Sequence, residues 1–109
     1  MRSAREAIAP EFAIRRSEPA GEVVLELSGE FDLTGVDRFE QAAADIPPGA
    51  RVSVDLAELG FLDSSGLRAL MNLDVRNAGA RITLRAPQPH VLRLLEMCGF
   101  GERFEIVSG

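Results

Sequence analysis

The chain has 109 residues and a formal net charge of −5, with 17 acidic against 12 basic residues. This length suits a single domain, and the negative charge argues against a nucleic-acid or anionic-membrane surface. Every basic residue is an arginine, and Tyr and Trp are absent, which excludes a phosphate-loop lysine, a Schiff base and Tyr or Trp base-stacking platforms.

Cys98 and His90 are the only cysteine and the only histidine. A lone cysteine cannot form an intramolecular disulfide, and a zinc site would rely mainly on carboxylates. No apolar run approaches the ~18–20 residues that span a bilayer, and residues 1–12 lack the apolar stretch of a signal peptide. We therefore expect a cytoplasmic protein with no metal or cofactor, in which Cys98 is buried at the end of an apolar helical stripe.

Residues 1–10 show no apolar period and end in a proline, so we expect a flexible arm there and a domain over residues 11–109. Alternating apolar and polar residues predict two strands, around 12–15 and 23–28. The turn-forming run at 17–21 lies between them, which predicts a hairpin.

The first predicted helix carries apolar residues at helical spacing over 36–43. Thr34 and Asp37 resemble a capping box at its start, and two prolines with a glycine at 47–49 end it. Alternation then predicts a third strand over 52–56.

A loop over 57–63 is expected to lead into a second helix, with a short strand at 82–84, a third helix from Pro89 and a last strand at 104–106. The apolar positions of the two helices are Leu67, Leu70, Met71 and Val75, then Val91, Leu94, Leu95 and Cys98. The alternation of strands and helices predicts an α/β domain, a mixed sheet of about five strands with helices packed on it. The core is expected to contain Val23, Leu25, Val52, Val54, Leu70, Met71, Leu94 and Leu95.

The most informative stretch is Asp63-Ser64-Ser65-Gly66, where strand and loop give way to the second helix. Asp63 is a strong N-cap that can accept N–H bonds from Ser65 or Gly66. Ser64 then takes the first helical position, where a phosphate would meet free backbone N–H groups and the positive end of the helix dipole. Gly66 leaves a bare surface for a partner. These residue types are also common at helix starts for capping alone, so their spacing does not by itself show phosphorylation.

The run from Asp63 to Leu67 resembles the signature of the STAS domain (sulfate transporter and anti-sigma-factor antagonist), in which Asp-Ser-Ser-Gly-Leu opens the second helix. Two further segments resemble family features: Gly-Glu-Phe-Asp at 29–32 and the end of the third helix at 94–100. The resemblance covers about residues 11–107, with its parts in the family's order.

The resemblance implies an anti-sigma-factor antagonist that is not an enzyme. Its partner would be an anti-sigma factor that is also a serine kinase, and binding would release a sigma factor. The kinase would phosphorylate Ser64 and a phosphatase would reverse the step, with Asp32, Asp63, Ser65 and Gly66 also in the partner-binding surface. The family usually closes with a fourth helix, which has no counterpart after the last predicted strand.

Three alternatives remain open. A hydrolase using Ser64, His90 and an acid would lack the Gly-x-Ser-x-Gly elbow. A STAS module of another kind, in a stress complex or associated with a transporter or lipid transport, would have the same fold. Gly29, Gly60 and Gly66 do not form a phosphate-cradling loop, so any nucleotide binding would be weak.

Overall fold

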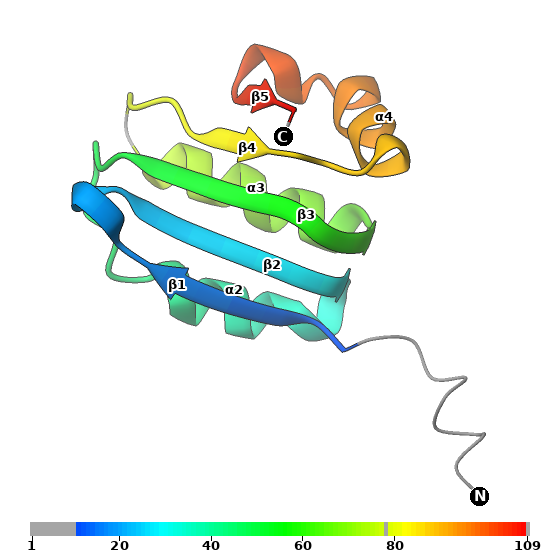
Figure 1. The fold of residues 1–109 in the computed structure, drawn as a ribbon, viewed down its shortest axis with the longest axis horizontal. Coiled ribbons are helices and arrows are strands. Elements are labelled where there is room, and N and C mark those ends of the chain that lie inside the picture. Colours follow the sequence, from blue (N-terminus) through cyan, green and yellow to red (C-terminus); the bar gives the residue numbers. More distant parts are fainter. Residues whose placement is uncertain (1–10, 78, 109) are drawn as a thin grey trace, which may run out of the picture.

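The computed structural model describes residues 11–77 and 79–108, and the arm expected over 1–10 lies outside the described residues (Figure 1). In this described part of the chain, five strands form one sheet in the spatial order β1-β2-β3-β4-β5. The hairpin partners β1 and β2 are antiparallel, and the other neighbouring pairs are parallel. The strands are β1 Ala13–Ser17, β2 Val23–Phe31, β3 Val52–Leu62, β4 Thr83–Arg85 and β5 Glu105–Val107.

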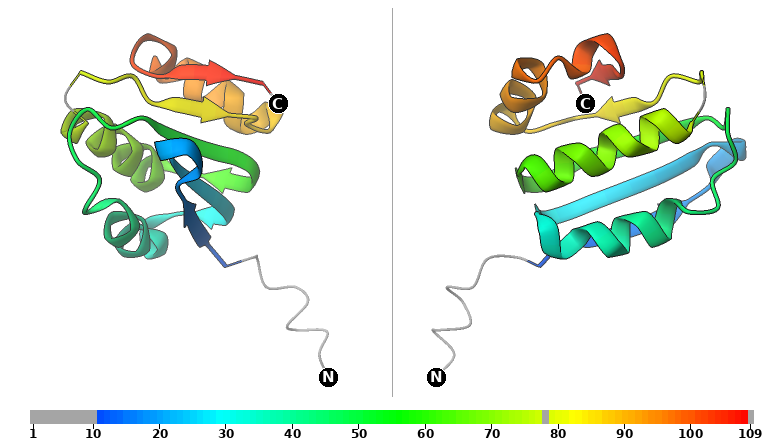
Figure 2. Two further views of the ribbon diagram at one scale, coloured as in Figure 1. Left: turned by 60° about the vertical axis from the view of Figure 1, so that its left-hand side comes forward. Right: turned by 180° about the vertical axis from the view of Figure 1, so that it is seen from behind.

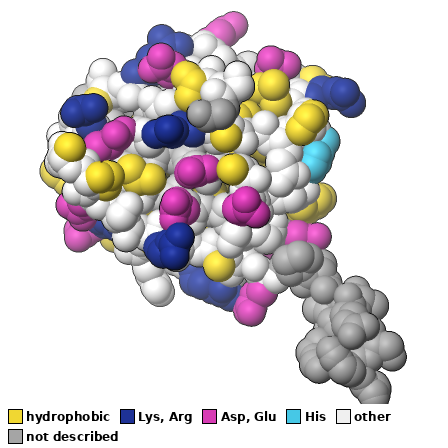
Figure 3. All heavy atoms as spheres, viewed as in Figure 1, with side chains coloured by type: hydrophobic (Ala, Val, Ile, Leu, Met, Phe, Trp, Pro, Cys, Tyr) yellow, Lys and Arg dark blue, Asp and Glu magenta, His cyan; other side chains and the backbone are white. Residues whose placement is uncertain are grey.

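Within residues 11–77 and 79–108, three α-helices and three short 3-10 helices connect the strands in the order that the sequence predicts. They are η1 Pro19–Gly21, η2 Leu33–Gly35, α2 Val36–Ala43, α3 Ser64–Arg76, α4 Pro89–Met97 and η3 Phe100–Glu102. Helices α2 and α3 cover one face of the sheet, and α4 lies at the β4–β5 end (Figures 1 and 2). The opposite face of β1, β2 and β3, turned toward the viewer in Figure 3, carries acidic and basic side chains.

The expected loop over 57–63 is wrong, because β3 continues to Leu62. Buried Leu59 and Leu62 pair with Gly29 and Phe31 of β2. The register shifts between Glu26 and Ser28 and again between Gly29 and Glu30, and two pairs of consecutive exposed residues interrupt the alternation of β3. Such irregularities break the period of two on which the sequence argument relied.

The capping box expected from Thr34 and Asp37 is also wrong. Thr34 belongs to η2, and Gly35 caps α2 without a side-chain hydrogen bond. The Thr34 hydroxyl instead donates to the Asp32 carboxylate over 2.6 Å. Gly35 fits there because a Cβ would lie 2.7 Å from the Phe12 ring, which packs against this turn.

The core lies between the sheet and its helices, and its largest aromatic group is close to the start of α2. The Phe31 ring stacks on Phe12 at a centroid distance of 4.4 Å and meets Phe39 at 5.2 Å. Six of the eight predicted core residues are buried: Val23, Leu25, Val52, Val54, Leu70 and Leu95. The other two, Met71 and Leu94, are partly buried and pack against the core.

Two helical positions differ from the sequence prediction. Val75 is 63% exposed, because the inward stripe of α3 contains Ala69, Leu70 and Leu73. Cys98 is exposed, because α4 ends at Met97 and its stripe ends with buried Leu95. Gly99 has the left-handed φ of +77° that is typical of a residue after a helix end.

Leu70→Ala should lower the free energy of unfolding by ~2–5 kcal/mol, because Leu70 is fully buried and truncation leaves a cavity. Val75→Ala on the same helix is the matched control and should change it by less than about 0.5 kcal/mol. Urea denaturation followed by circular dichroism measures both. Equal losses of unfolding free energy in the two variants would contradict the described orientation of α3.

Candidate functional site

The site is built where the parallel strands β2 and β3 end side by side. Phe31 pairs with Leu62, and each strand is followed by an aspartate that caps a helix, Asp32 before η2 and Asp63 before α3. The two caps have nearly the same extended backbone, with φ/ψ of −120°/−165° and −113°/−170°. The Asp63 N–H donates to the Phe31 carbonyl over 3.3 Å, which ties the two helix starts together.

The predicted N-cap is confirmed. The Asp63 carboxylate accepts the N–H groups of Ser65 at 2.9 Å and Gly66 at 3.2 Å. Ser64 is the first residue of α3 and is exposed, whereas Ser65 is half-buried. The structure therefore presents one serine of the pair to solvent.

The first turn of α3 has fewer free N–H groups than the sequence argument assumed. Ser65 and Gly66 donate to the Asp63 carboxylate, and the Leu67 N–H donates to the Asp63 carbonyl over 2.9 Å. The expectation that a phosphate on Ser64 would meet a set of free backbone donors is therefore wrong for these three residues. The capping carboxylate already occupies the place of an external anion.

Gly66 differs from its expected role as a bare outer surface. It is buried, and a Cβ there would lie 2.5 Å from Leu62 Cδ1 and 2.8 Å from the Phe31 carbonyl oxygen. The missing side chain thus faces the sheet and lets the first turn of α3 approach the end of β2. Gly66 positions Ser64 and offers little surface to a partner.

A small groove of about 210 Å³ runs between the η2–α2 segment and α3, and we call it the Ser64 groove. Its polar side chains come from α3, and its apolar wall includes Leu33, which is 72% exposed. The residues that line it are Leu33, Val36, Ser64, Ser65, Arg68, Ala69 and Asn72.

Leu33 and Arg68 were not predicted from the sequence as parts of this site. Arg68 follows Ser64 by four residues, which places both on one side of a helix. This spacing could have predicted that Arg68 lies beside Ser64. Leu33 gave no signal, because a leucine between a strand and a helix is typical of a core position.

Asp32 is held as an anion by its own turn. The Thr34 hydroxyl and the Thr34 N–H both donate to its carboxylate, at 2.6 Å and 3.0 Å, and they lower the pKa of Asp32 below its usual value. Asp32 and Asp63 therefore place two carboxylates where β2 and β3 end.

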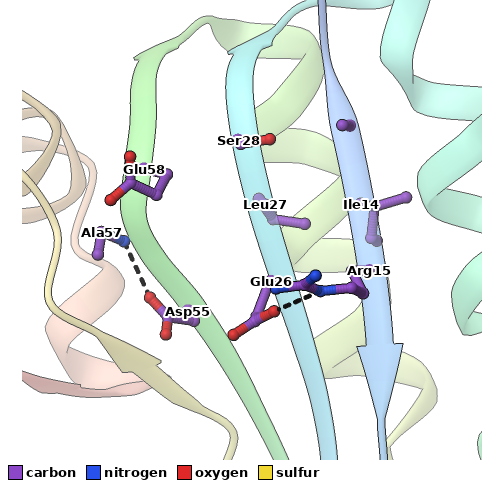
Figure 4. A pocket seen from close by; sticks show the side chains of 9 residues that line it. Ile14, Arg15, Glu26, Leu27, Ser28, Asp55, Ala57 and Glu58 are labelled. Atoms are coloured by element: carbon purple, nitrogen blue, oxygen red, sulfur yellow. Dashed lines mark hydrogen bonds and ion pairs between the residues drawn. The ribbon is translucent and has the colours of Figure 1, made fainter.

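A larger hollow of about 550 Å³ lies on the open face of the sheet, over β1, β2 and β3 (Figure 4). Arg15 there pairs with Glu26 at 3.0 Å, and the Asp55 carboxylate accepts the Ala57 N–H at 3.0 Å. Neither Ser64 nor its neighbours line it. Within 11–77 and 79–108, no group of three or more His, Cys, Asp or Glu side chains is placed to hold a metal ion.

The structure does not assemble the triad of the hydrolase alternative. His90 is exposed in the first turn of α4, and its Nε2 lies 2.6 Å from the Gly60 carbonyl oxygen. No hydrogen bond joins His90 to Ser64 among the residues that the structure describes. No described helix is long and apolar enough to cross a membrane.

Comparison with protein families gives a match over residues 14–108 to the family described as "Mlab, STAS domain". The chain therefore belongs to the STAS family. The search of curated proteins returned no significant match.

Solved structures with this fold include an anti-sigma factor antagonist from Mycobacterium paratuberculosis, with a TM-score of 0.80 and 22% identity over 91% of this chain and 87% of that one. The anti-sigma factor antagonist SpoIIAA in its unphosphorylated form has a TM-score of 0.68 and 23% identity, covering 86% and 87%. The Bacillus cell fate determinant SpoIIAA in the phosphorylated form has a TM-score of 0.63 and 22% identity, covering 86% and 90%. These similarities confirm the predicted α/β fold of the family.

Gly66→Ala should destabilise the protein by about 1–3 kcal/mol, because the new methyl group meets a backbone oxygen that cannot move without disturbing β2. Gly101→Ala is the matched control, since nothing lies within 4 Å of a Cβ there. Thermal unfolding of both variants measures the difference. An unchanged melting temperature in Gly66→Ala would rule out the close packing of α3 on Phe31.

Thr34→Val should raise the pKa of Asp32 toward its usual value, because the hydroxyl is the strongest contributor to its lowering. A carboxyl pKa that is lower in the folded than in the unfolded chain stabilises the fold above the unfolded value. That contribution is lost as the pH falls through the folded pKa. Carbon-13 NMR titration of the carboxyl group measures the change, with Thr83→Val as the control. If the pKa of Asp32 is the same in the parent, Thr34→Val and Thr83→Val proteins, the Thr34 contact is excluded.

Proposed function

We propose that the protein is an anti-sigma-factor antagonist, a non-enzymatic module that binds an anti-sigma factor with serine-kinase activity and thereby releases a sigma factor. Phosphorylation of Ser64 by that kinase weakens the complex, and a phosphatase restores it. The observation that carries the proposal is the exposed Ser64 at the first position of α3, within a STAS fold. The cytoplasm is the compartment in which such a protein acts.

The similar structures support this function. Two of them are described as anti-sigma factor antagonists, and SpoIIAA is described in both an unphosphorylated and a phosphorylated form. A protein of this fold that exists in both forms is consistent with a phosphorylation switch on the same fold. At identities of 22–23%, these proteins share the fold of this chain.

The binding surface that we propose consists of Asp32, Asp63, Ser64 and Ser65, extended by Leu33. An exposed leucine in the same groove as the acceptor serine offers a partner an apolar contact next to polar side chains. A kinase must enclose the serine hydroxyl to transfer a phosphoryl group, so the modified residue afterwards lies inside the contact.

The switch acts through charge at the interface rather than through refolding. Phosphorylation adds roughly −1.5 to −2 charge and three acceptor oxygens next to Asp63. Helix α3 is anchored by buried Ala69, Leu70 and Leu73, which leaves its backbone little freedom to respond. The phosphate therefore changes the surface that the partner meets while the fold stays the same.

A second candidate is a STAS regulatory module that serves a complex other than a sigma-factor system. The observation that favours it is the family description itself, which reads "Mlab, STAS domain" and mentions no sigma factor. Such a module would use the same groove for a partner that transfers no phosphoryl group. Incubation with the cognate kinase and ATP separates the candidates, because only the antagonist gains a phosphate at Ser64.

Ser64→Glu should weaken binding to the anti-sigma factor by roughly 30- to 5,000-fold, because the added negative charge lies beside Asp63 and becomes buried in the contact. Ser64→Ala should bind like the parent protein and stay bound when ATP is added. Isothermal titration calorimetry measures the affinities, and Ser17→Glu, at an exposed site on β1, is the charge-matched control. Equal binding of the two glutamate variants would overturn the switch.

A further inference from the structure

We propose that Arg68 is the counter-ion of the phosphate on Ser64 and holds it within the Ser64 groove. This inference rests on the proposed phosphorylation of Ser64 and assigns that modification a specific partner within the same helix. The guanidinium of Arg68 and the phosphate would form a charge-assisted pair along one side of α3.

The geometry of α3 brings the two side chains together. Ser64 and Arg68 are four residues apart, and helical side chains lean toward the N-terminus, so a residue covers the turn that precedes it. Both side chains line the same groove of about 210 Å³. An anion that precedes a cation by four residues is also the favourable order on a helix.

A phosphate on Ser64 needs such a partner because the helix start does not supply enough donors. The N–H groups of Ser65 and Gly66 already donate to Asp63, as does that of Leu67. The Asp63 carboxylate also repels a second anion at this short range. A cation nearby is the remaining way to offset the added charge.

Arg68 is available for this role. Among residues 11–77 and 79–108, no carboxylate lies within ion-pair distance of it and no hydrogen bond from its side chain is present. Several other arginines are already engaged with carboxylates: Arg15, Arg16, Arg38, Arg76 and Arg103. The planar guanidinium can bind two phosphate oxygens at once, which a point charge cannot do.

The pairing explains how the phosphate would block the partner. Held by Arg68, it fills the groove beside Leu33 and hides the apolar contact that the unmodified protein offers. The partner then meets an occupied groove and an excess of negative charge at the same place.

The test uses the full chain with phosphoserine incorporated at position 64 during synthesis, so that no kinase is needed. Phosphorus-31 NMR titration gives the second pKa of the phosphate, ordinarily about 6. Arg68→Gln should raise this pKa by about 0.3–0.7 relative to the parent, as expected for loss of an exposed ion pair. Arg68→Lys should restore part of the difference, and 1 M salt should reduce it.

Arg51→Gln is the matched control, because it removes the same charge just before β3, at the end of the strand away from Ser64. It should leave the phosphate pKa within about 0.1 of the parent, because a remote exposed charge is screened. Equal pKa values for the phosphate in the Arg68→Gln and Arg51→Gln proteins would overturn the proposal. A kinase that fails to modify Ser64 would refute the proposed function and leave this titration result standing.

Discussion

The parallel pairing of β2 with β3 through Phe31 and Leu62 is the contact on which the rest of the site depends. It brings two strand ends to the same edge of the sheet, so that Asp32 and Asp63 each begin a helical segment beside the other. Gly66 then allows α3 to approach the Phe31 carbonyl. This packing fixes the start of α3, and Ser64, the first residue of that helix, is exposed there.

The sequence predicted the order of the elements, the Asp63 cap and the start of α3 at Ser64, because these depend on local patterns. It did not predict the length of β3, since the register shifts between Glu26 and Ser28 and between Gly29 and Glu30 break the alternation. It misplaced Val75 because an apolar residue can lie on the outside of a helix at little cost. The inward role of Gly66 depends on a contact with another strand, which no local pattern contains.

The same packing limits how the protein can respond to modification. The Asp63 cap already uses the N–H groups of Ser65 and Gly66, so under the proposed switch a phosphate on Ser64 would be balanced by side chains. Arg68 and Leu33 both line the Ser64 groove, one from α3 and the other from η2. A fixed helix start with an exposed serine is suited to a switch in affinity. One covalent change there can alter binding and leave the fold intact.

A comparison of nitrogen-15 amide spectra of the unmodified and Ser64-phosphorylated proteins tests this account most directly. The account predicts chemical-shift changes limited to residues around the Ser64 groove, in η2 and the first two turns of α3. The amide signals of β1, β4 and α4 should stay in place. Changes spread across the sheet would mean that phosphorylation rearranges the fold, and they would contradict a switch that acts by local charge.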